Sequence, residues 1–438
     1  MKKTITLQKI IYGLFFLILI VATIFVSINK KSYSKWNLDA DRIEFRFPPL
    51  EATISISETE TLKKRLAESK DPNELSSLQA QLANVYVSTA KKTGQTELYS
   101  EAETLAISSL SLVSENPQAT MALVKVLSAR HEFGKALELL NSVNLNTKSS
   151  GDIIYLRALT FLALGRFDEA FTDAIALANQ SPSLSTATLK ALVYNHLGLD
   201  DLAFHYFSKA LELEDIGEDA QAVLTRGQFA VFLIKKGNYT DAIRLTDAAL
   251  KVIPNSAYVK LVKAQALNAQ KKYVEAYALL TRAFADSKEP IYLLNMVFSL
   301  KLQKKSEDFN VLAQESIDIY KKEIKENLYG HLLDLASLYY VTENYKECIK
   351  TVLLDQQNRR NLRGDLLLAK SYIKQSKISD ARDVLEKQIA TGTTEVALYY
   401  LIKTILNEKT ELSLIQLYDL KAEQNNPNYN MDLLFTLP

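Results

Sequence analysis

A short turn motif recurs along this chain at almost constant spacing. Its clearest copy is LGRFDEA at residues 164–170, where Gly165 suits the left-handed end of one helix and Asp168 suits the start of another. Each copy ends in a small residue, and these anchors are Ala102, Ala136, Ala170, Ala203, Ala242, Ala276, Cys348 and Ala381. Their successive steps are 34, 34, 33, 39, 34, 72 and 33 residues, and we interpret the 72 as two steps of 36 with a worn copy near residues 311–313. Such a period predicts an array of stacked helical hairpins.

A second spacing supports the hairpin interpretation. Twelve residues before each later anchor stands another small residue, which gives the pairs Ala158/Ala170, Ala191/Ala203, Ala230/Ala242, Ala264/Ala276, Ala336/Cys348 and Ala369/Ala381. Small side chains at both places let two antiparallel helices approach closely. The chain's only cysteine, Cys348, occupies one of these positions, so we interpret it as a packing residue rather than a nucleophile.

The segment YLRALTFLALGRFDEAFTDAIALANQSP, residues 155–182, shows the full order of the repeat. Its marker residues are Ala158, Phe161, Gly165, Ala170 and Pro182. This order resembles the tetratricopeptide repeat (TPR) family, and the resemblance covers most of residues 75–420. It implies an all-α, TPR-type α-solenoid of about nine helical hairpins, with residues 421–438 as a C-terminal tail or cap. Residues 78–143 further resemble the opening repeats of membrane-anchored bacterial TPR proteins whose role is unassigned.

The N-terminal region carries a run of 19 residues without a charge, IIYGLFFLILIVATIFVSI, at residues 10–28. As a helix it would be about 28 Å long, close to the roughly 30 Å of a bilayer core. Lysines and aromatic residues flank it, and no convincing cleavage site follows. We therefore expect a nine-residue tail (1–9), a single transmembrane anchor in the lipid bilayer (10–28) and a juxtamembrane spacer (29–74). A bacterial inner-membrane protein with its solenoid outside the cytoplasm is the expected location, although three lysines on each side leave the orientation open.

Composition and motifs bear on the kind of ligand. The formal net charge is +1, with 52 basic and 51 acidic residues, so the basic excess typical of nucleic-acid binding is absent. The sequence contains no HExxH, CxxC, GxxxxGK[ST], GxGxxG or GxSxG motif. We therefore expect no metal, no cofactor, no small-molecule substrate and no enzymatic activity.

What remains is binding of a protein or peptide. The resemblance implies a concave groove lined by the first helix of each hairpin, and the family pattern places there Tyr155, Leu159, Thr188, Asn195, His196, Gln265, Asn268, Ser337 and Tyr340. These apolar and neutral polar groups suit an extended peptide or a partner helix. The expected function is a membrane-anchored scaffold that assembles or maintains a bacterial envelope complex.

Two alternatives to that function stay open. One is a cytosol-facing receptor or cochaperone on an organelle membrane, which is weakened because no cationic clamp for a C-terminal carboxylate is evident. The other is a regulatory subunit of a separately encoded enzyme.

Overall fold

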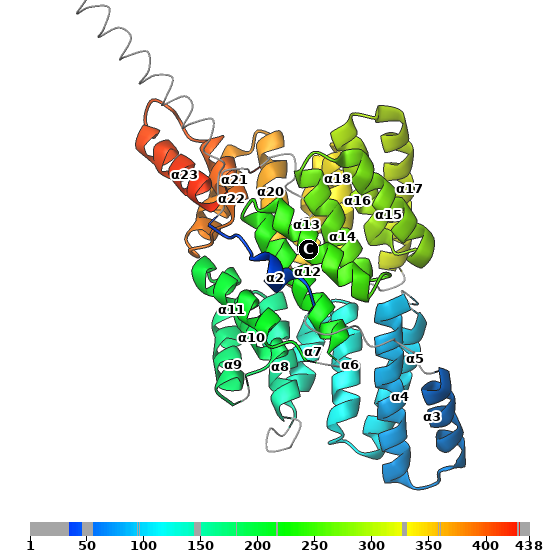
Figure 1. Cartoon of the computed structure of the whole chain (residues 1–438). Coiled ribbons are helices and arrows are strands. Elements are labelled where there is room, and N and C mark those ends of the chain that lie inside the picture. Colours follow the sequence, from blue (N-terminus) through cyan, green and yellow to red (C-terminus); the bar gives the residue numbers. More distant parts are fainter. Residues whose placement is uncertain are drawn as a thin grey trace, which may run out of the picture. The chain divides into compact units, whose positions relative to one another are not determined.

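The computed structural model describes residues 35–45, 56–93, 95, 97–143, 150–180, 182–215, 218–325, 331–357, 359, 361–426 and 429. This part of the chain is helical and contains no strand (Figure 1). Its helices are α2 (Ala40–Ile43), α3 (Ile56–Glu68), α4 (Pro72–Thr93), α5 (Glu97–Leu112), α6 (Pro117–Ala129), α7 (Phe133–Asn141), α8 (Ser150–Ala163), α9 (Phe167–Gln180), α10 (Leu184–His196), α11 (Asp200–Glu212), α12 (Asp219–Lys235), α13 (Tyr239–Val252), α14 (Ala257–Ala269), α15 (Tyr273–Ser287), α16 (Pro290–Gln303), α17 (Ser306–Lys325), α18 (Leu332–Val341), α19 (Tyr345–Asp355), α20 (Leu362–Lys374), α21 (Ile378–Ile389), α22 (Val396–Lys403) and α23 (Leu412–Asn425).

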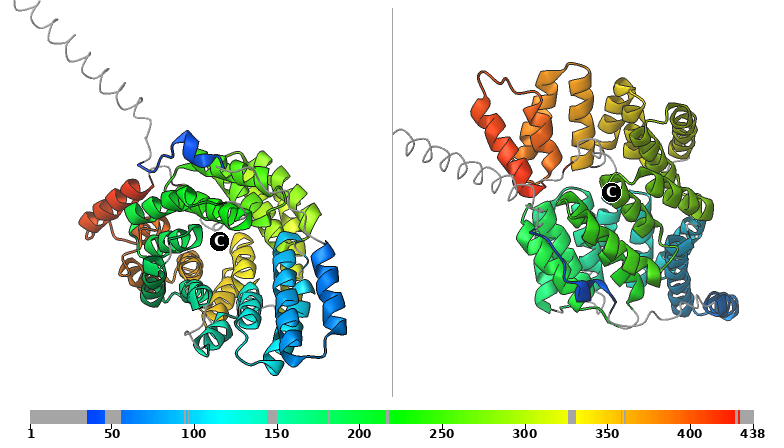
Figure 2. Two further views of the ribbon diagram at one scale, coloured as in Figure 1. Left: turned by 60° about the horizontal axis from the view of Figure 1, so that its bottom comes forward. Right: turned by 45° about the horizontal axis from the view of Figure 1, so that its top comes forward.

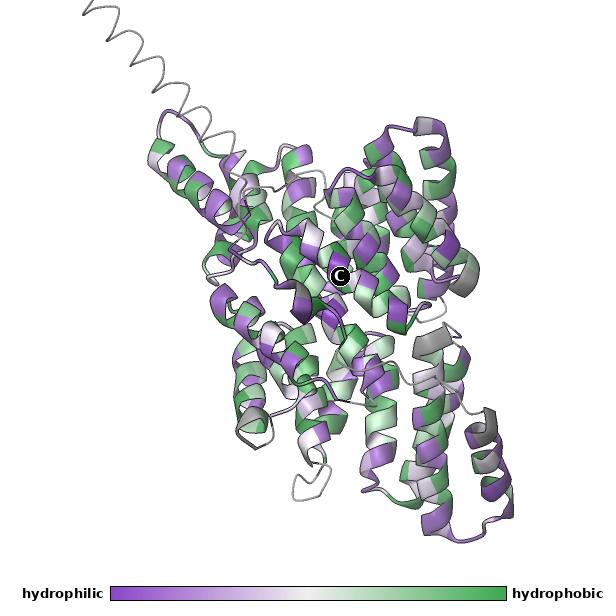
Figure 3. Ribbon diagram, viewed as in Figure 1, coloured by the Kyte–Doolittle hydropathy of each residue, from purple (hydrophilic) through white to green (hydrophobic). Residues whose placement is uncertain are grey.

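Helices α4 to α21 pair in sequence order into nine hairpins, and α22 with α23 adds a further pair. Apolar and polar residues alternate around the helices (Figure 3), as expected when one face packs on neighbours and another meets solvent. The predicted all-α solenoid is confirmed. Among the described helices none is both long enough and apolar enough to cross a bilayer. The anchor predicted at residues 10–28 lies outside the described residues.

The hairpin turns share one backbone device. In eight of them the residue that ends the first helix has a positive φ of 58–80°, and these residues are His131, Gly165, Gly198, Gly237, Lys271, Lys304, Glu343 and Ser376. The amide of the following residue then reaches back over the helix end, as in Arg166 N–H to the Phe161 carbonyl (2.9 Å). This is the Schellman arrangement, which satisfies carbonyls that the helix end leaves free.

The turns also correct the interpretation of the worn repeat. The left-handed residues are spaced 34, 33, 39, 34, 33, 39 and 33 apart, so the 72-residue step consists of 33 and 39 rather than two steps of 36. The hidden turn is at Lys304, and the anchor position five residues later is held by Phe309 rather than by residues 311–313. Val297 stands twelve residues before it, so this hairpin lacks the small pair. The extra length is accommodated by α17, which has 20 residues.

The small-residue pairs have the packing role that their spacing predicts. All twelve members, from Ala158 to Ala381, have 0% of their surface exposed. Burial also raises the pKa of Cys348 to about 11, because the apolar surroundings disfavour the thiolate. This cysteine is therefore a poor nucleophile at neutral pH.

Part of the region expected to be a spacer packs on the solenoid. In α3, Leu62 is buried in a cluster with Leu78 and Leu82 of α4. Residues 38–45, which we call the strap, lie against α11 and α13. The Leu38 amide donates to Asp241 Oδ2 (2.9 Å), and Ile43 is buried. Phe45 of the strap packs with Ala210 of α11 and Ala222 of α12, the two helices between which the first 39-residue step falls.

Arg226 of α12 joins the strap to the repeats. Its guanidinium has no exposed surface and forms an ion pair with the buried Glu214, with Nη2 at 3.0 Å from Oε2. It also donates to the carbonyls of Ile43 and Glu44 (3.4 Å each) and lies 3.5 Å from the centroid of the Phe45 ring. One buried cation thus meets a carboxylate, two carbonyls and an aromatic face.

The solenoid winds so far that its later hairpins contact its earlier ones (Figure 2). We call this contact the seam: the turns of the hairpins from α6 to α13 meet the loops that precede α20 and α22. His131 Nδ1 lies 2.9 Å from Arg359 Nη1, and Lys236 Nζ donates to Asp200 (2.7 Å) and to Thr394 (3.1 Å). His131 and Arg359 are 228 residues apart in the sequence, and Lys236 and Thr394 are 158 apart. Lys236 and Asp200 are separated by 36 residues.

Two glycine substitutions test whether the early and late hairpins are in contact at the seam. At Gly198 an added Cβ would lie 2.6 Å from the Gly392 carbonyl oxygen, whereas at Gly392 it would meet nothing within 4 Å, and both residues have positive φ (72° and 79°). We expect Gly392→Ala to lower the free energy of unfolding by about 1–2 kcal/mol through backbone strain alone. Gly198→Ala should cost a further 1–3 kcal/mol or so, because the backbone at the seam must shift. Urea denaturation tests this, and equal losses in both variants would contradict the seam.

Arg226 and Glu214 allow a second test. Arg226→Met leaves the Glu214 carboxylate buried without its cation, so we expect a loss of about 3–5 kcal/mol in the free energy of unfolding. In the double variant Arg226→Met/Glu214→Leu no buried charge remains, and most of that loss should be recovered. Denaturant titration of the three proteins checks this. A double variant no more stable than Arg226→Met would contradict this and show that the loss comes from the strap contacts of Arg226, not from the unpaired Glu214 carboxylate.

Candidate partner-binding face

The first helices of the hairpins lie on the inner side of the curved array. Each first helix from α4 to α20 contacts the first helix of the next hairpin, whereas the described second helices of neighbouring hairpins make few or no such contacts. A stack whose elements are closer together on one side must bend toward that side. The even-numbered helices from α4 to α22 therefore form the inner face.

Four of the nine residues predicted to line the groove are instead buried between helices: Thr188, Gln265, Asn268 and Ser337 are at most 2% exposed. Thr188 Oγ1 lies 2.9 Å from Thr225 Oγ1 of the next first helix, and Asn268 Nδ2 donates to Ser299 Oγ (3.1 Å) in the same way. The inner curvature brings neighbouring first helices so close that these positions serve contacts between them. The other five, Tyr155, Leu159, Asn195, His196 and Tyr340, keep exposed surface.

Four of those five lie on two neighbouring first helices. Tyr155 and Leu159 project from α8, and Asn195 and His196 from the end of α10. Gln221 of α12 lies near Tyr155, and burial raises the pKa of the Tyr155 phenol to about 12, so it stays protonated at neutral pH. One helical turn beyond Gln221, Leu224 is 37% exposed.

We call these six residues the inner patch: Tyr155, Leu159, Asn195, His196, Gln221 and Leu224. Gln221 was not identifiable from the family pattern, because it lies in the first turn of α12, which is longer than α10 and α14. The ring of His196 stacks on Phe167 (5.0 Å between centroids), which holds it at the edge of the patch. The inner patch offers apolar surface, hydroxyl and amide groups, and no lysine or arginine.

Gln265 stands out on the inner face. It lies in the same repeat register as Leu159 and Ser337, one residue after the first small residue of its pair. It is 2% exposed, yet neither its Nε2 nor its Oε1 has a hydrogen-bond partner among the described residues. A buried amide left unpaired costs about 1–3 kcal/mol, so a turn of the Gln265 side chain toward a ligand that brings both a donor and an acceptor would be favourable.

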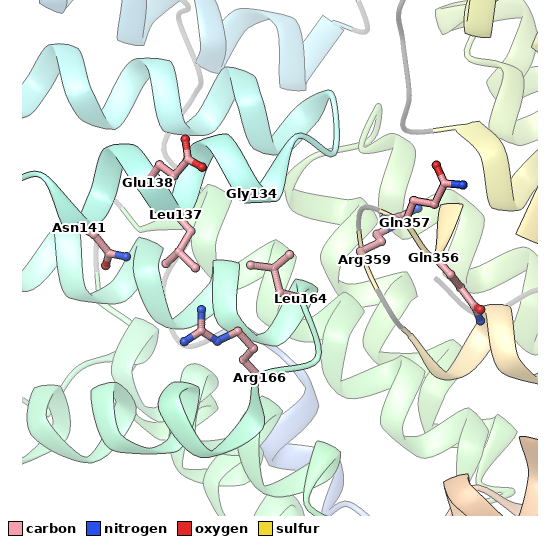
Figure 4. Close-up of a pocket in the computed structure, with 9 residues that line it drawn as sticks. All are labelled: Gly134, Leu137, Glu138, Asn141, Leu164, Arg166, Gln356, Gln357 and Arg359. Carbon is pink, nitrogen blue, oxygen red and sulfur yellow. The ribbon is translucent and has the colours of Figure 1, made fainter. Parts of the chain in front are cut away.

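A separate cleft of about 460 Å³ lies at the seam (Figure 4). It is lined by α7 on one side and by Gln356, Gln357 and Arg359 on the other. Its cations already have partners: Arg166 pairs with Glu169 (2.6 Å) and Arg359 with Asp355 (3.2 Å). Burial and the neighbouring Arg359 lower the pKa of His131 to about 3, so the neutral imidazole accepts from the guanidinium. The cleft is thus part of the seam, and we assign it no ligand.

Within the described residues, no group of three His, Cys, Asp or Glu side chains is placed to hold a metal ion. The inner face is therefore the candidate site.

Comparison with known proteins agrees with the architecture. A tetratricopeptide repeat family model matches residues 233–290, which span the end of α12 to the start of α16. No curated protein matches the sequence. Among solved structures, a human IFIT1 dimer with PPP-AAAA is 13% identical, with 85% of this chain and 95% of that chain covered and a TM-score of 0.42. A monomeric IFIT1 mutant with m7Gppp-AAAA is also 13% identical, covers 85% and 96%, and has a TM-score of 0.43.

Likeness at that level says nothing about the ligand of the present chain. The matching model is a repeat and not a catalytic family, and repeats of this kind are typically non-enzymatic scaffolds for protein interaction. The chain thus carries tetratricopeptide repeat sequence within an all-helical, TPR-like solenoid.

Proposed function

We propose that this protein is a scaffold whose inner face binds an extended, mainly apolar peptide segment of a partner protein. The observation that carries the proposal is Gln265, whose buried donor and acceptor both lack partners among the described residues. In an extended peptide the N–H and C=O of one residue point to the same side, so a single residue can pair with both atoms of that amide.

The inner patch supports the same kind of ligand. Leu159 and Leu224 offer apolar surface, while Tyr155, Asn195 and Gln221 supply neutral hydrogen-bonding groups. Phosphate recognition generally relies on lysine and arginine, and the inner patch has neither. An apolar peptide therefore fits this surface better than a polyanion does.

We further propose that residues 10–28 anchor the scaffold in a membrane. The proposal rests on the uncharged run of 19 residues and its flanking lysines. A tethered scaffold of this kind suits the assembly or maintenance of a bacterial envelope complex, with the solenoid outside the cytoplasm. The strap begins ten residues after the end of the run.

Peptide binding is tested with a phage-displayed library of random dodecapeptides selected on the full chain in detergent. We expect enrichment of sequences rich in leucine and phenylalanine. The triple variant Tyr155→Ala/Asn195→Ala/His196→Ala should reduce binding of the selected peptides at least about tenfold, since it removes apolar and hydrogen-bonding contacts together. The matched control is Val274→Ala/Glu275→Ala on the exposed surface of α15, which should bind normally. Equal loss in both variants, or none in either, would reject the inner patch.

The anchor is tested by alkaline carbonate extraction of membranes from cells that express the chain. The full chain should stay in the membrane pellet, and a variant carrying Leu17→Lys and Ile20→Lys should be released, because charges at the centre of a span oppose insertion. The variant Lys30→Leu/Lys31→Leu, which leaves residues 10–28 intact, should remain in the pellet. Release of the unmodified chain would contradict the anchor.

A further inference from the structure

The chain turns back toward the inner face after the last helix. Asn426, which ends α23, is 1% exposed, and its Nδ2 donates to the carbonyl of Lys235 (2.9 Å) at the end of α12. Lys235 has the same repeat register as His196 of the inner patch, five residues after the small residue of its helix. The contact therefore brings residue 426 to the edge of the inner face.

Tyr429 is held by the last pair of helices. Its ring stacks on Tyr400 of the first helix α22, with 5.2 Å between centroids and 11° between planes. Burial raises the pKa of its phenol, and the hydroxyl has no hydrogen-bond partner among the described residues. The chain thus reaches residue 429 while held between two first helices, α12 through Asn426 and α22 through Tyr429.

The residues that follow have the composition expected of an inner-face ligand. Residues 430–438 read NMDLLFTLP and include the apolar side chains Met431, Leu433, Leu434, Phe435 and Leu437. Nine residues span at most about 30 Å when extended. Residue 429 is three residues from Asn426, so it lies at most about 11 Å from the end of α12, and a neighbouring helix lies about 8–10 Å further. Gln265 on α14 is therefore within reach of residues 430–438.

We propose that residues 430–438 bind the inner face of their own chain, across α12 and α14, and occupy the peptide site as an internal ligand. Their backbone then supplies the donor and acceptor that Gln265 lacks. This inference rests on the proposed peptide-binding function, because it assigns the tail to the same face. It adds regulation: a partner peptide has to displace the tail before it binds.

The effective concentration of an attached segment favours binding of residues 430–438 to their own chain over binding to a second copy of the chain. A segment attached through a short connection has an effective concentration in the millimolar range. A second copy at micromolar concentration competes poorly with it. Binding of the tail to another molecule is therefore the alternative outcome of the test rather than the expectation.

The test uses the full chain with a photo-crosslinking benzoylphenylalanine in place of Phe435. Illumination should produce adducts within one molecule, and mass spectrometry should map them to α12 or α14. The control carries the same group in place of Leu412, which is 55% exposed on α23, and should give no adduct with those helices. Adducts on second helices, adducts between two molecules, or none above the control would overturn the proposal.

A second readout separates this proposal from the proposed function. Ending the chain after Tyr429 removes only residues 430–438 and leaves every described residue in place. The selected library peptides should then bind about tenfold or more tighter than they bind the full chain. If the library peptides bind the shortened chain and the full chain with equal affinity, the tail is not an internal ligand, but the proposed peptide binding is still supported. If no library peptide binds either protein, peptide binding fails, while the crosslinks still decide where the tail lies.

Discussion

The structure depends on the close approach of two helices at a pair of small side chains. Ala158 against Ala170 is one instance, and all twelve such residues are entirely buried. A larger side chain at either place would force the helices apart. Because the pair recurs with the repeat, one local contact sets the geometry of six of the nine hairpins, and their stacking follows from it.

The stacked hairpins curve, and this curvature determines which side chains of the inner face are exposed. First helices contact one another from hairpin to hairpin, which buries Thr188, Asn268 and Ser337 in contacts between helices. The same curvature carries the array round until turns such as that at Gly198 meet the loop at Gly392. Where a longer step opens the stack between α11 and α12, the strap and the buried Arg226 fill the gap.

Much of this architecture could be predicted from the sequence, because the hairpin contact is local. The spacing of small residues identified the hairpins, but the turn at Lys304 was missed because Lys304 and Phe309 stand where glycine and alanine stand in the clearest copy. The docking of the strap was also missed, since Arg226 lies more than 180 residues from the carbonyls it binds. The burial of Gln265 depends on how tightly the array curves, and curvature is a sum of small rotations that no single repeat encodes. Tyr155, Leu159, Asn195 and His196 keep exposed surface on first helices, and their place in a binding groove stays a prediction from the repeat register.

The central claim is that the hairpins wind into a closed superhelix whose inner face is a confined surface. Pulsed electron–electron resonance across the seam tests it most directly, with spin labels on cysteines in place of Glu138 and Gln357 in a Cys348→Ala background. These two residues line opposite sides of the seam cleft, and neither is buried. A closed superhelix predicts one short, narrow distance distribution between the labels. A long and broad distribution would show that the array is open, and would contradict the account.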